Sequence, residues 1–382
     1  MSGTSADGID VAIIETDGID VFGLGPCLTV PYPPALRRRI MATYGATRAP
    51  AAVVEELTHA HAAAIDLLVN KNNVSNLNIK IIGFHGQTIL HRPQDRVTVQ
   101  IGDGALLARL TGCAVVNRFR DADVAAGGEG APLVPLYHAA LARRAVRDGR
   151  LELPVAIVNI GGVANVTYVG TAGAHDLIAF DTGPGNALID DWARATKGLA
   201  MDRGGRLAAA GAVDRRALDR LLAHRFFRRR PPKSLDRDAY SLAPLVGLSA
   251  ADGAATLTAF TVHAIARAAR HFPAPPKRWL VAGGGVANRT LMRGLAEAVG
   301  EVAPVEAVGW RSDALEAEAF AYLAVRSLRG LPLSLPATTG VPKPMPGGVI
   351  HSPPRADSSR SPRLRSPRPR SSARRAGPRK SG

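Results

Sequence analysis

One stretch of the chain, residues 179–187, restricts the fold more strongly than any other. It reads Ala-Phe-Asp-Thr-Gly-Pro-Gly-Asn-Ala, with an apolar strand before Asp181 and apolar residues at helical spacing after Ala187. In open α/β sheets, ligands bind beyond the carboxyl ends of the strands, where turns of this kind lie. The stretch therefore predicts an α/β fold in which Asp181 ends a strand and faces a ligand.

The residue types around Asp181 leave two interpretations open. A carboxylate beside an open helix N-terminus can act as a catalytic base, but an aspartate in such a place can also simply form the turn. Gly183 and Gly185 would let the backbone approach a ligand closely, and Asn186 is suited to cap the following helix. Taken alone, this stretch favours neither interpretation.

Further glycine-rich turns repeat the pattern elsewhere in the chain. The opening segment 2–14 and the segment 155–168 each predict a hairpin, and their spacing indicates an internal duplication. The first hairpin offers hydroxyls and backbone N–H groups to a phosphate, although a plain hairpin explains it equally well. A third cluster, Gly283-Gly-Gly285, follows a predicted strand and opens a helix, which suits close approach of a nucleoside.

Polar residues that could bind a sugar follow two other predicted strands. His85 and Gln87 come after the strand near 79–84, and Arg120 comes after the strand near 114–117. His85 alone is better explained as a structural histidine. Arg120 could bind a substrate carboxylate, but a structural Arg–Asp pair within its loop is just as easy to form. A helix is expected after Ser312, which would be its N-cap, with Glu316 in its early part.

Composition excludes several classes of protein. The 382 residues are enough for two domains, and no run of 18 apolar residues predicts a membrane span. The N-terminal segment has neither a basic start nor an apolar signal region, so we expect a cytoplasmic protein. Cys27 and Cys113 predict no disulfide or metal framework and are expected to be buried thiols.

The positive charge is concentrated at the C-terminal end. Residues 352–382 contain nine Arg and one Lys against one Asp, so they carry +9 of the formal charge of +16 and leave +7 for residues 1–351. This Arg/Ser/Pro-rich tail is expected to be disordered, and it is the only feature that would favour nucleic acid, non-specifically. The separate basic run 228–234 is expected to be a solvated loop.

Taken together, six motifs resemble the anhydro-N-acetylmuramic acid kinase family, within the superfamily of sugar kinases, Hsp70 and actin. They follow one another in unbroken order over roughly residues 1–351, which makes the combination specific. The motifs are residues 1–10, 83–88, 117–123 with 127–134, 159–165, 180–186 and 283–288.

The resemblance implies two ribonuclease-H-like α/β domains flanking an ATP cleft. The expected boundaries are 1–150 for the first domain, 151–351 for the second and 352–382 for the tail. The helix near 312–328 is a candidate to pack back on the first domain. The implied reaction uses ATP, Mg²⁺ and water to convert 1,6-anhydro-N-acetylmuramic acid into N-acetylmuramic acid 6-phosphate in peptidoglycan recycling. Membrane partners are not expected, and a homodimer is left open.

The resemblance also assigns roles to individual residues. Asp181 and Glu316 are expected to be catalytic, His85, Gln87 and Arg120 to contact the sugar, and no residue is assigned as a metal ligand. The expected ATP-binding residues are Gly3, Thr4, Ser5, Ala6, Asp7, Gly8, Ile9, Asp10, Gly161, Gly162, Gly183, Gly283, Gly284 and Gly285. Two alternatives remain: a kinase for another amino sugar, and a non-catalytic ATP-binding switch.

Overall fold

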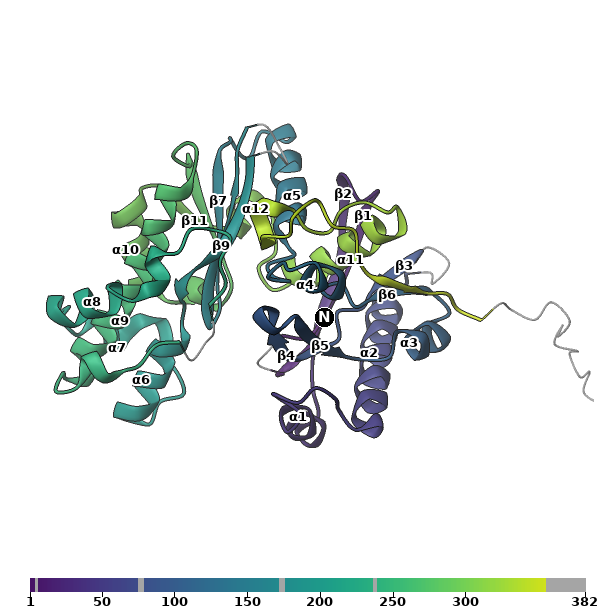
Figure 1. Cartoon of the computed structure of the whole chain (residues 1–382), viewed down its shortest axis with the longest axis horizontal. Coiled ribbons are helices and arrows are strands. Elements are labelled where there is room, and N and C mark those ends of the chain that lie inside the picture. The colour runs from purple at the N-terminus through teal and green to yellow at the C-terminus, as the bar shows by residue number, and fades with distance from the viewer. Residues whose placement is uncertain (4–5, 75–78, 172–175, 236–238, 355–382) are drawn as a thin grey trace, which may run out of the picture.

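A computed structural model describes residues 1–3, 6–74, 79–171, 176–235 and 239–354. The chain forms two α/β halves that lie side by side (Figure 1). Thr4 and Ser5 of the expected phosphate turn, and the basic tail from residue 355 onward, lie outside the described residues. Within the described ranges, no helix is both long enough and apolar enough to cross a bilayer.

The N-terminal half begins with a long antiparallel hairpin. In its turn, Asp17 Oδ1 accepts hydrogen bonds from the amides of Ile19 and Asp20, both at 2.8 Å. The strands of this half are β1 (Gly8–Thr16), β2 (Val21–Pro31), β3 (Ile81–Gly83), β4 (Gln87–Arg92), β5 (Val97–Ile101) and β6 (Ala114–Asn117). Its helices are α1 (Pro34–Met41), α2 (Ala51–Lys71), α3 (Gly104–Thr111), α4 (Asp121–Ala125) and α5 (Pro135–Arg147).

The C-terminal half is built on one five-stranded sheet in the order β11-β10-β7-β8-β9. The strands are β7 (Val155–Ile160), β8 (Val163–Val169), β9 (Leu177–Pro184), β10 (Arg278–Ala282) and β11 (Val302–Pro304). β7, β8 and β9 form an antiparallel meander, whereas β10 runs parallel to both β7 and β11. The helices are α6 (Ala187–Lys197), α7 (Arg206–Ala209), α8 (Arg215–Leu222), α9 (Ala250–Ala266) and α10 (Arg289–Val299).

The two halves repeat one strand pattern. In the N-terminal half, β1 and β2 pair antiparallel as β8 and β9 do, and β3 and β6 pair parallel as β10 and β11 do. A meander followed by parallel strands, in the order third, second, first, fourth, fifth, is the ribonuclease-H-like arrangement. The predicted fold class and the predicted duplication are therefore confirmed.

Segments from the end of the chain return to the N-terminal half. Helix α11 (Leu315–Leu328) packs on β1 and β3, and β12 (Val349–His351) pairs antiparallel with β6. The short helix α12 (Pro336–Thr339) instead packs on β9 of the other half. A central hydrophobic cluster joins the halves, with Tyr137 of α5, Phe320 of α11 and Leu280 of β10 among its buried members.

Two local expectations were wrong. Cys27 is exposed because it lies on the same face of β2 as Thr29 and Pro31, which are also exposed, whereas Cys113 is buried. Ser312 does not cap the following helix, which begins at Leu315 after Ala314. Its hydroxyl instead accepts a hydrogen bond from the Gly283 amide at 2.7 Å, so it stabilises a glycine turn.

Candidate active site

Three glycine-containing turns meet at one edge of the C-terminal sheet. β7, β9 and β10 run in the same direction, so their carboxyl ends share this edge. The carbonyl of Gly162 accepts a hydrogen bond from the Gly185 amide at 2.9 Å, and that of Gly161 accepts one from the Asn186 amide at 2.8 Å. The arrangement places the β7–β8 turn directly against the start of α6.

Close backbone contacts explain why glycine stands at two of these positions. A Cβ on Gly185 would lie 2.3 Å from the Gly161 carbonyl oxygen. Gly283 has a φ of +80°, and a Cβ there would lie 2.5 Å from Asn159 Oδ1. Neither site tolerates a side chain, because real Cβ atoms do not approach so closely. Asn186 stands at the N-cap of α6 as expected, but its side chain donates to the Ile160 carbonyl at 3.1 Å instead of capping.

Asp181 lies beside this edge, inside β9. The strand was expected to end at Asp181, but it continues to Pro184 because these residues still pair with β8. The segment after the basic run holds Asp181 in place. The Asp181 amide donates to the Lys233 carbonyl at 3.0 Å, and the Leu235 amide donates to Asp181 Oδ2 at 2.8 Å. The carboxylate is thus oriented through one oxygen.

The surroundings of Asp181 raise its pKa toward neutral pH. Desolvation raises the pKa of Asp181 to about 7, and the Leu235 hydrogen bond opposes that shift. The negative charge of Glu129 raises the pKa further, whereas Lys233 and Arg229 lower it. A carboxylate with a pKa near the working pH has the proton affinity that a general base needs.

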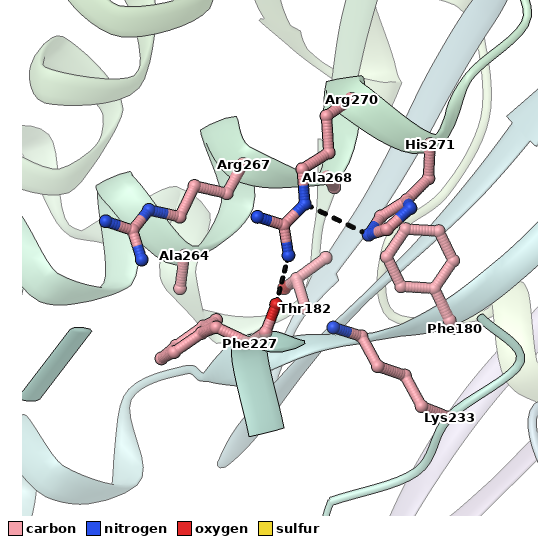
Figure 2. A pocket seen from close by; sticks show the side chains of 9 residues that line it. All are labelled: Phe180, Thr182, Phe227, Lys233, Ala264, Arg267, Ala268, Arg270 and His271. Atoms are coloured by element: carbon pink, nitrogen blue, oxygen red, sulfur yellow. Dashed lines mark hydrogen bonds between the residues drawn. The ribbon is translucent and has the colours of Figure 1, made fainter. Parts of the chain in front are cut away.

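Lys233 is not part of a solvated loop, contrary to the expectation for residues 228–234. Its side chain is 4% exposed, and its Nζ lies 4.3 Å from the centre of the Phe226 ring and 5.7 Å from that of Phe180. Figure 2 shows Lys233 beside Phe180, close to Arg270 and His271. Burial, together with the positive charges of Arg270 and Arg229, lowers the pKa of Lys233 to about 8. The lysine fixes the segment that holds Asp181.

Glu129 connects this segment to the N-terminal half. It lies in the glycine-rich loop after α4, where its amide donates to the Thr339 carbonyl at 2.6 Å. Its carboxylate accepts a hydrogen bond from the Ser234 hydroxyl and lies 3.7 Å from Arg229 Nη2. Leu235, whose amide orients Asp181, directly follows Ser234 in the chain. The contact between Glu129 and Ser234 therefore links the N-terminal half to the segment that orients Asp181.

Arg120 is fixed from two sides in the N-terminal half. Its Nε donates to His85 Nε2 at 3.2 Å, and its Nη1 donates to the Gly130 carbonyl at 2.7 Å. His85 Nδ1 lies 3.0 Å from the Gly86 carbonyl and is therefore the protonated nitrogen of a neutral ring. Burial and Arg120 hold the pKa of His85 well below its usual value. An Arg–Asp pair in this loop is formed by Arg118 and Asp121 and does not include Arg120, whose contact with the sugar stays a prediction.

Gln87 holds the opening turn. It is fully buried, accepts a hydrogen bond from the Ser2 hydroxyl at 2.6 Å and donates to the Gly3 carbonyl at 3.0 Å. Ala6 follows with a φ of +47°, and its amide donates to the Gly3 carbonyl. Of the other expected phosphate-loop residues, Asp7 is exposed, whereas Gly8, Ile9 and Asp10 belong to β1. A sugar contact by Gln87 remains a prediction.

Glu316 and Asp10 face a common region beside the N-terminus. Desolvation raises the pKa of Glu316, with Arg120 opposing the shift and Asp10 reinforcing it. Desolvation also raises the pKa of Asp10, which the hydrogen bond from Thr29 to Asp10 Oδ1 at 2.7 Å opposes. Within the described part of the chain, no group of three or more His, Cys, Asp or Glu residues could hold a metal ion by itself.

Comparison with known proteins decides the family. The model of the anhydro-N-acetylmuramic acid kinase family matches residues 1–353. The chain belongs to this family. An anhydro-N-acetylmuramic acid kinase of Rhodospirillum rubrum is 56% identical over 355 residues, which span 91% of this chain and 92% of that protein. Another, of Paramagnetospirillum magneticum, is 53% identical over 357 residues and covers 92% of this chain and 98% of its own length.

A solved structure with some similarity is component A of the (R)-2-hydroxyglutaryl-CoA dehydratase of Acidaminococcus fermentans. The similarity covers 83% of this chain and 99% of that protein, with 11% sequence identity and a TM-score of 0.42. The family assignment agrees with the resemblance that the six sequence motifs carry.

Proposed function

We propose that this member of the anhydro-N-acetylmuramic acid kinase family uses ATP and water to open 1,6-anhydro-N-acetylmuramic acid and phosphorylate its O6. The products are N-acetylmuramic acid 6-phosphate and ADP. The observation that carries this proposal is Asp181, a carboxylate oriented by the Leu235 amide, with a pKa of about 7, next to converging glycine turns.

In the proposed reaction, Asp181 takes a proton from water as the water oxygen attacks C1 of the sugar. The C1–O6 bond breaks, and O6 accepts the γ-phosphoryl group of ATP, so that ADP leaves. Asp181 ends the step protonated and returns its proton to solvent. Arg120, held by His85 and Gly130, would bind the lactyl carboxylate, and Glu316 would contact the sugar on the same side.

The proposed nucleotide site uses the glycine turns at the sheet edge. Backbone N–H groups of the opening turn, and the turns at Gly161–Gly162 and Gly283–Gly285, suit the phosphates and the nucleoside. The proposed division is 1–150 for the half that binds the sugar and 151–351 for the half that binds the nucleotide, with α11 on the first.

Mg²⁺ is proposed as part of this site. It usually keeps several waters and binds through one or two carboxylates together with substrate phosphates, so a full set of protein ligands is not needed. Asp10, with Glu316 and Asp7 in its neighbourhood, offers carboxylates beside the opening turn. Burial is the main cause of the raised pKa of both Asp10 and Glu316; the charge of Asp7 adds to the shift of Asp10, and the charge of Asp10 adds to that of Glu316. A bound Mg²⁺ would neutralise phosphate charge during transfer.

ADP release with and without 1,6-anhydro-N-acetylmuramic acid tests the proposal, with the mass of the sugar product recorded. We expect ADP release to depend on the sugar, and the product to gain both water and a phosphoryl group. Equal rates of ADP release with and without the sugar would favour the non-catalytic ATP-binding switch. Release with another amino sugar, and not with this one, would favour the alternative kinase.

The pKa of Asp181 predicts a pH dependence. The base acts in its ionised form, so kcat/KM should rise with pH, with a midpoint near pH 7, and level off above it. Well below the midpoint, kcat/KM should fall about tenfold for each pH unit. A profile that stays flat from pH 5 to pH 8 would contradict the role of Asp181 as the base.

Glu129 should influence that midpoint. Its negative charge raises the pKa of Asp181, so Glu129→Gln should move the midpoint of kcat/KM to lower pH. The glutamine oxygen can still accept the Ser234 hydrogen bond. Glu301→Gln, on the surface beside Arg278, is the matched control and should leave the profile unchanged. A midpoint that moved to higher pH would show that Glu129 acts in another way.

A further inference from the structure

Asp123, which the proposed reaction does not use, is a buried acidic residue on the short helix α4. It is 2% exposed, and its Oδ1 accepts a hydrogen bond from the Gly130 amide at 2.7 Å. Its Oδ2 accepts hydrogen bonds from the hydroxyls of Ser334 and Thr339, the latter at 2.6 Å. A carboxylate in such a buried place needs hydrogen bonds to both of its oxygens. Asp123 therefore fixes three segments of the chain relative to one another.

The glycine-rich loop after α4 folds tightly onto Asp123. The Gly128 amide donates to the Asp123 carbonyl at 2.9 Å, and a Cβ on Gly128 would lie 2.2 Å from Asp123 Oδ1. Gly130 has a φ of +66°, and a Cβ there would lie 2.4 Å from a methyl group of Val124 on α4. Glycine at these two positions lets the backbone come this close. Between them, Glu129 is the residue whose side chain points away toward the other half.

Arg120 is the first functional group that depends on this loop. Its Nη1 donates to the carbonyl of Gly130, the residue whose amide Asp123 holds. Arg120 also stands at the N-cap of α4, so it lies one turn before Asp123 on the same helix. Burial lowers the pKa of Arg120, and the charges of Glu316 and Asp123 oppose that shift. Asp123 thus fixes the acceptor of the guanidinium and also favours its charged form.

The segment that orients Asp181 is the second group that depends on Asp123. Thr339, whose hydroxyl binds Asp123, accepts a hydrogen bond from the Glu129 amide through its own carbonyl at 2.6 Å. The carboxylate of Glu129 in turn accepts the hydroxyl of Ser234, next to the residue that orients Asp181. Thr339 also ends α12, and this helix packs on β9, the strand of Asp181. Asp123 is therefore bonded to both partners of the contact between the halves.

We propose that Asp123 is a positioning residue for both sides of the site, an inference that rests on the proposed function. Through Gly130 it holds Arg120 toward the lactyl carboxylate of the sugar. Through Thr339 it holds α12 and the glycine-rich loop against the segment that orients Asp181. One buried carboxylate thereby fixes the group that binds the sugar relative to the group that activates water. Asp123 itself contacts no reacting atom.

Asp123→Ala tests the effect on Arg120 through sugar binding. Calorimetry gives Kd for 1,6-anhydro-N-acetylmuramic acid and for 1,6-anhydro-N-acetylglucosamine, which lacks the lactyl group. The unchanged chain should bind the lactyl sugar about tenfold to a hundredfold more tightly, the scale of a charged hydrogen bond. In Asp123→Ala this ratio should fall about fivefold or more, because Gly130 loses its anchor. Asp123→Asn should keep most of the ratio, because its amide oxygen can still accept the Gly130 hydrogen bond.

Thr339→Val tests the effect on the segment that orients Asp181. It removes the hydroxyl that binds Asp123 and keeps the carbonyl that accepts the Glu129 amide. We expect hydrogen exchange at the Leu235 amide to become about fivefold faster or more in both Thr339→Val and Asp123→Ala. This readout needs neither sugar nor ATP, so it does not depend on the proposed reaction. If Asp123→Ala does not fold, exchange in Thr339→Val decides the role.

Asp202→Ala is the matched control, because Asp202 is a buried carboxylate of the other half. Its oxygens accept the amides of Leu207 at 2.8 Å and Ala208 at 3.0 Å. It should lower the melting temperature as Asp123→Ala does, yet leave the sugar ratio and the exchange at Leu235 unchanged. Unchanged values of both readouts in Asp123→Ala, or equal changes in Asp202→Ala, would overturn the positioning role. Equal binding of both sugars by the unchanged chain would count against the proposed function instead, and exchange at Leu235 would then decide the role of Asp123.

Discussion

Asp181→Asn should reduce sugar-dependent ADP release by about a hundredfold to ten-thousandfold, the usual contribution of a positioned general base. The asparagine oxygen can still accept the Leu235 hydrogen bond, so the local geometry should persist. What is lost is the group that takes the proton from water. Steady-state kinetics with 1,6-anhydro-N-acetylmuramic acid, with product mass as a second readout, measure the effect.

The melting temperature separates this loss from unfolding. Burial disfavours the ionised form of Asp181 in the folded protein, so at pH 8 a neutral asparagine should leave the melting temperature unchanged or raise it. Below the unfolded-state pKa of aspartate both side chains are neutral and the difference should vanish. Asp219→Asn on the exposed surface of α8 is the matched control. Full activity of Asp181→Asn would rule out Asp181 as the base.

Glu318→Ala should destabilise the protein by about 3 kcal/mol, the scale of a broken buried ion pair. The Glu318 side chain is fully buried and accepts hydrogen bonds from Tyr137 Oη at 2.7 Å and Arg311 Nε at 2.9 Å. Its removal would leave the tyrosine hydroxyl and the guanidinium without their acceptor in the central cluster. Chemical denaturation measures the change in the free energy of unfolding.

Glu316→Gln is the matched comparison, two residues earlier on the same helix. Glu316 is exposed by surface area, but surrounding protein groups still desolvate its carboxylate enough to raise its pKa, so a neutral glutamine should not lower the free energy of unfolding near neutral pH. Activity should fall instead, because Glu316 is proposed to contact the sugar. If Glu316→Gln were the destabilising variant and Glu318→Ala the inactive one, the two roles would have to be exchanged.

The sequence was sufficient to predict the repeated architecture and the order of strand, turn and helix around Asp181. Strand-turn patterns such as 155–168 are local signals, because alternating β-branched residues and Gly-Gly turns specify a hairpin without help from the rest of the chain. The family assignment rested on six such signals in order, and the comparison with known proteins confirmed it.

The supporting contacts of the site could not be predicted, because they depend on tertiary structure. Lys233 looks like part of a basic surface loop until the rings of Phe180 and Phe226 are seen to cover it. Glu129 reaches Ser234 across 105 positions of sequence. Ser312 resembles a helix cap, yet its hydroxyl binds the Gly283 amide instead. No local pattern distinguishes these uses from the ordinary ones.

The position of α11 has a consequence for biosynthesis. This helix is made more than 230 residues after β3, yet it covers the faces of β1 and β3, and β12 reaches β6 later still. During translation, the C-terminal sheet can pair its strands before the N-terminal half has its own covering helix. A fragment that stopped at residue 150 would lack α11, β12 and the buried Phe320, so the half that is synthesised first is the half that is completed last.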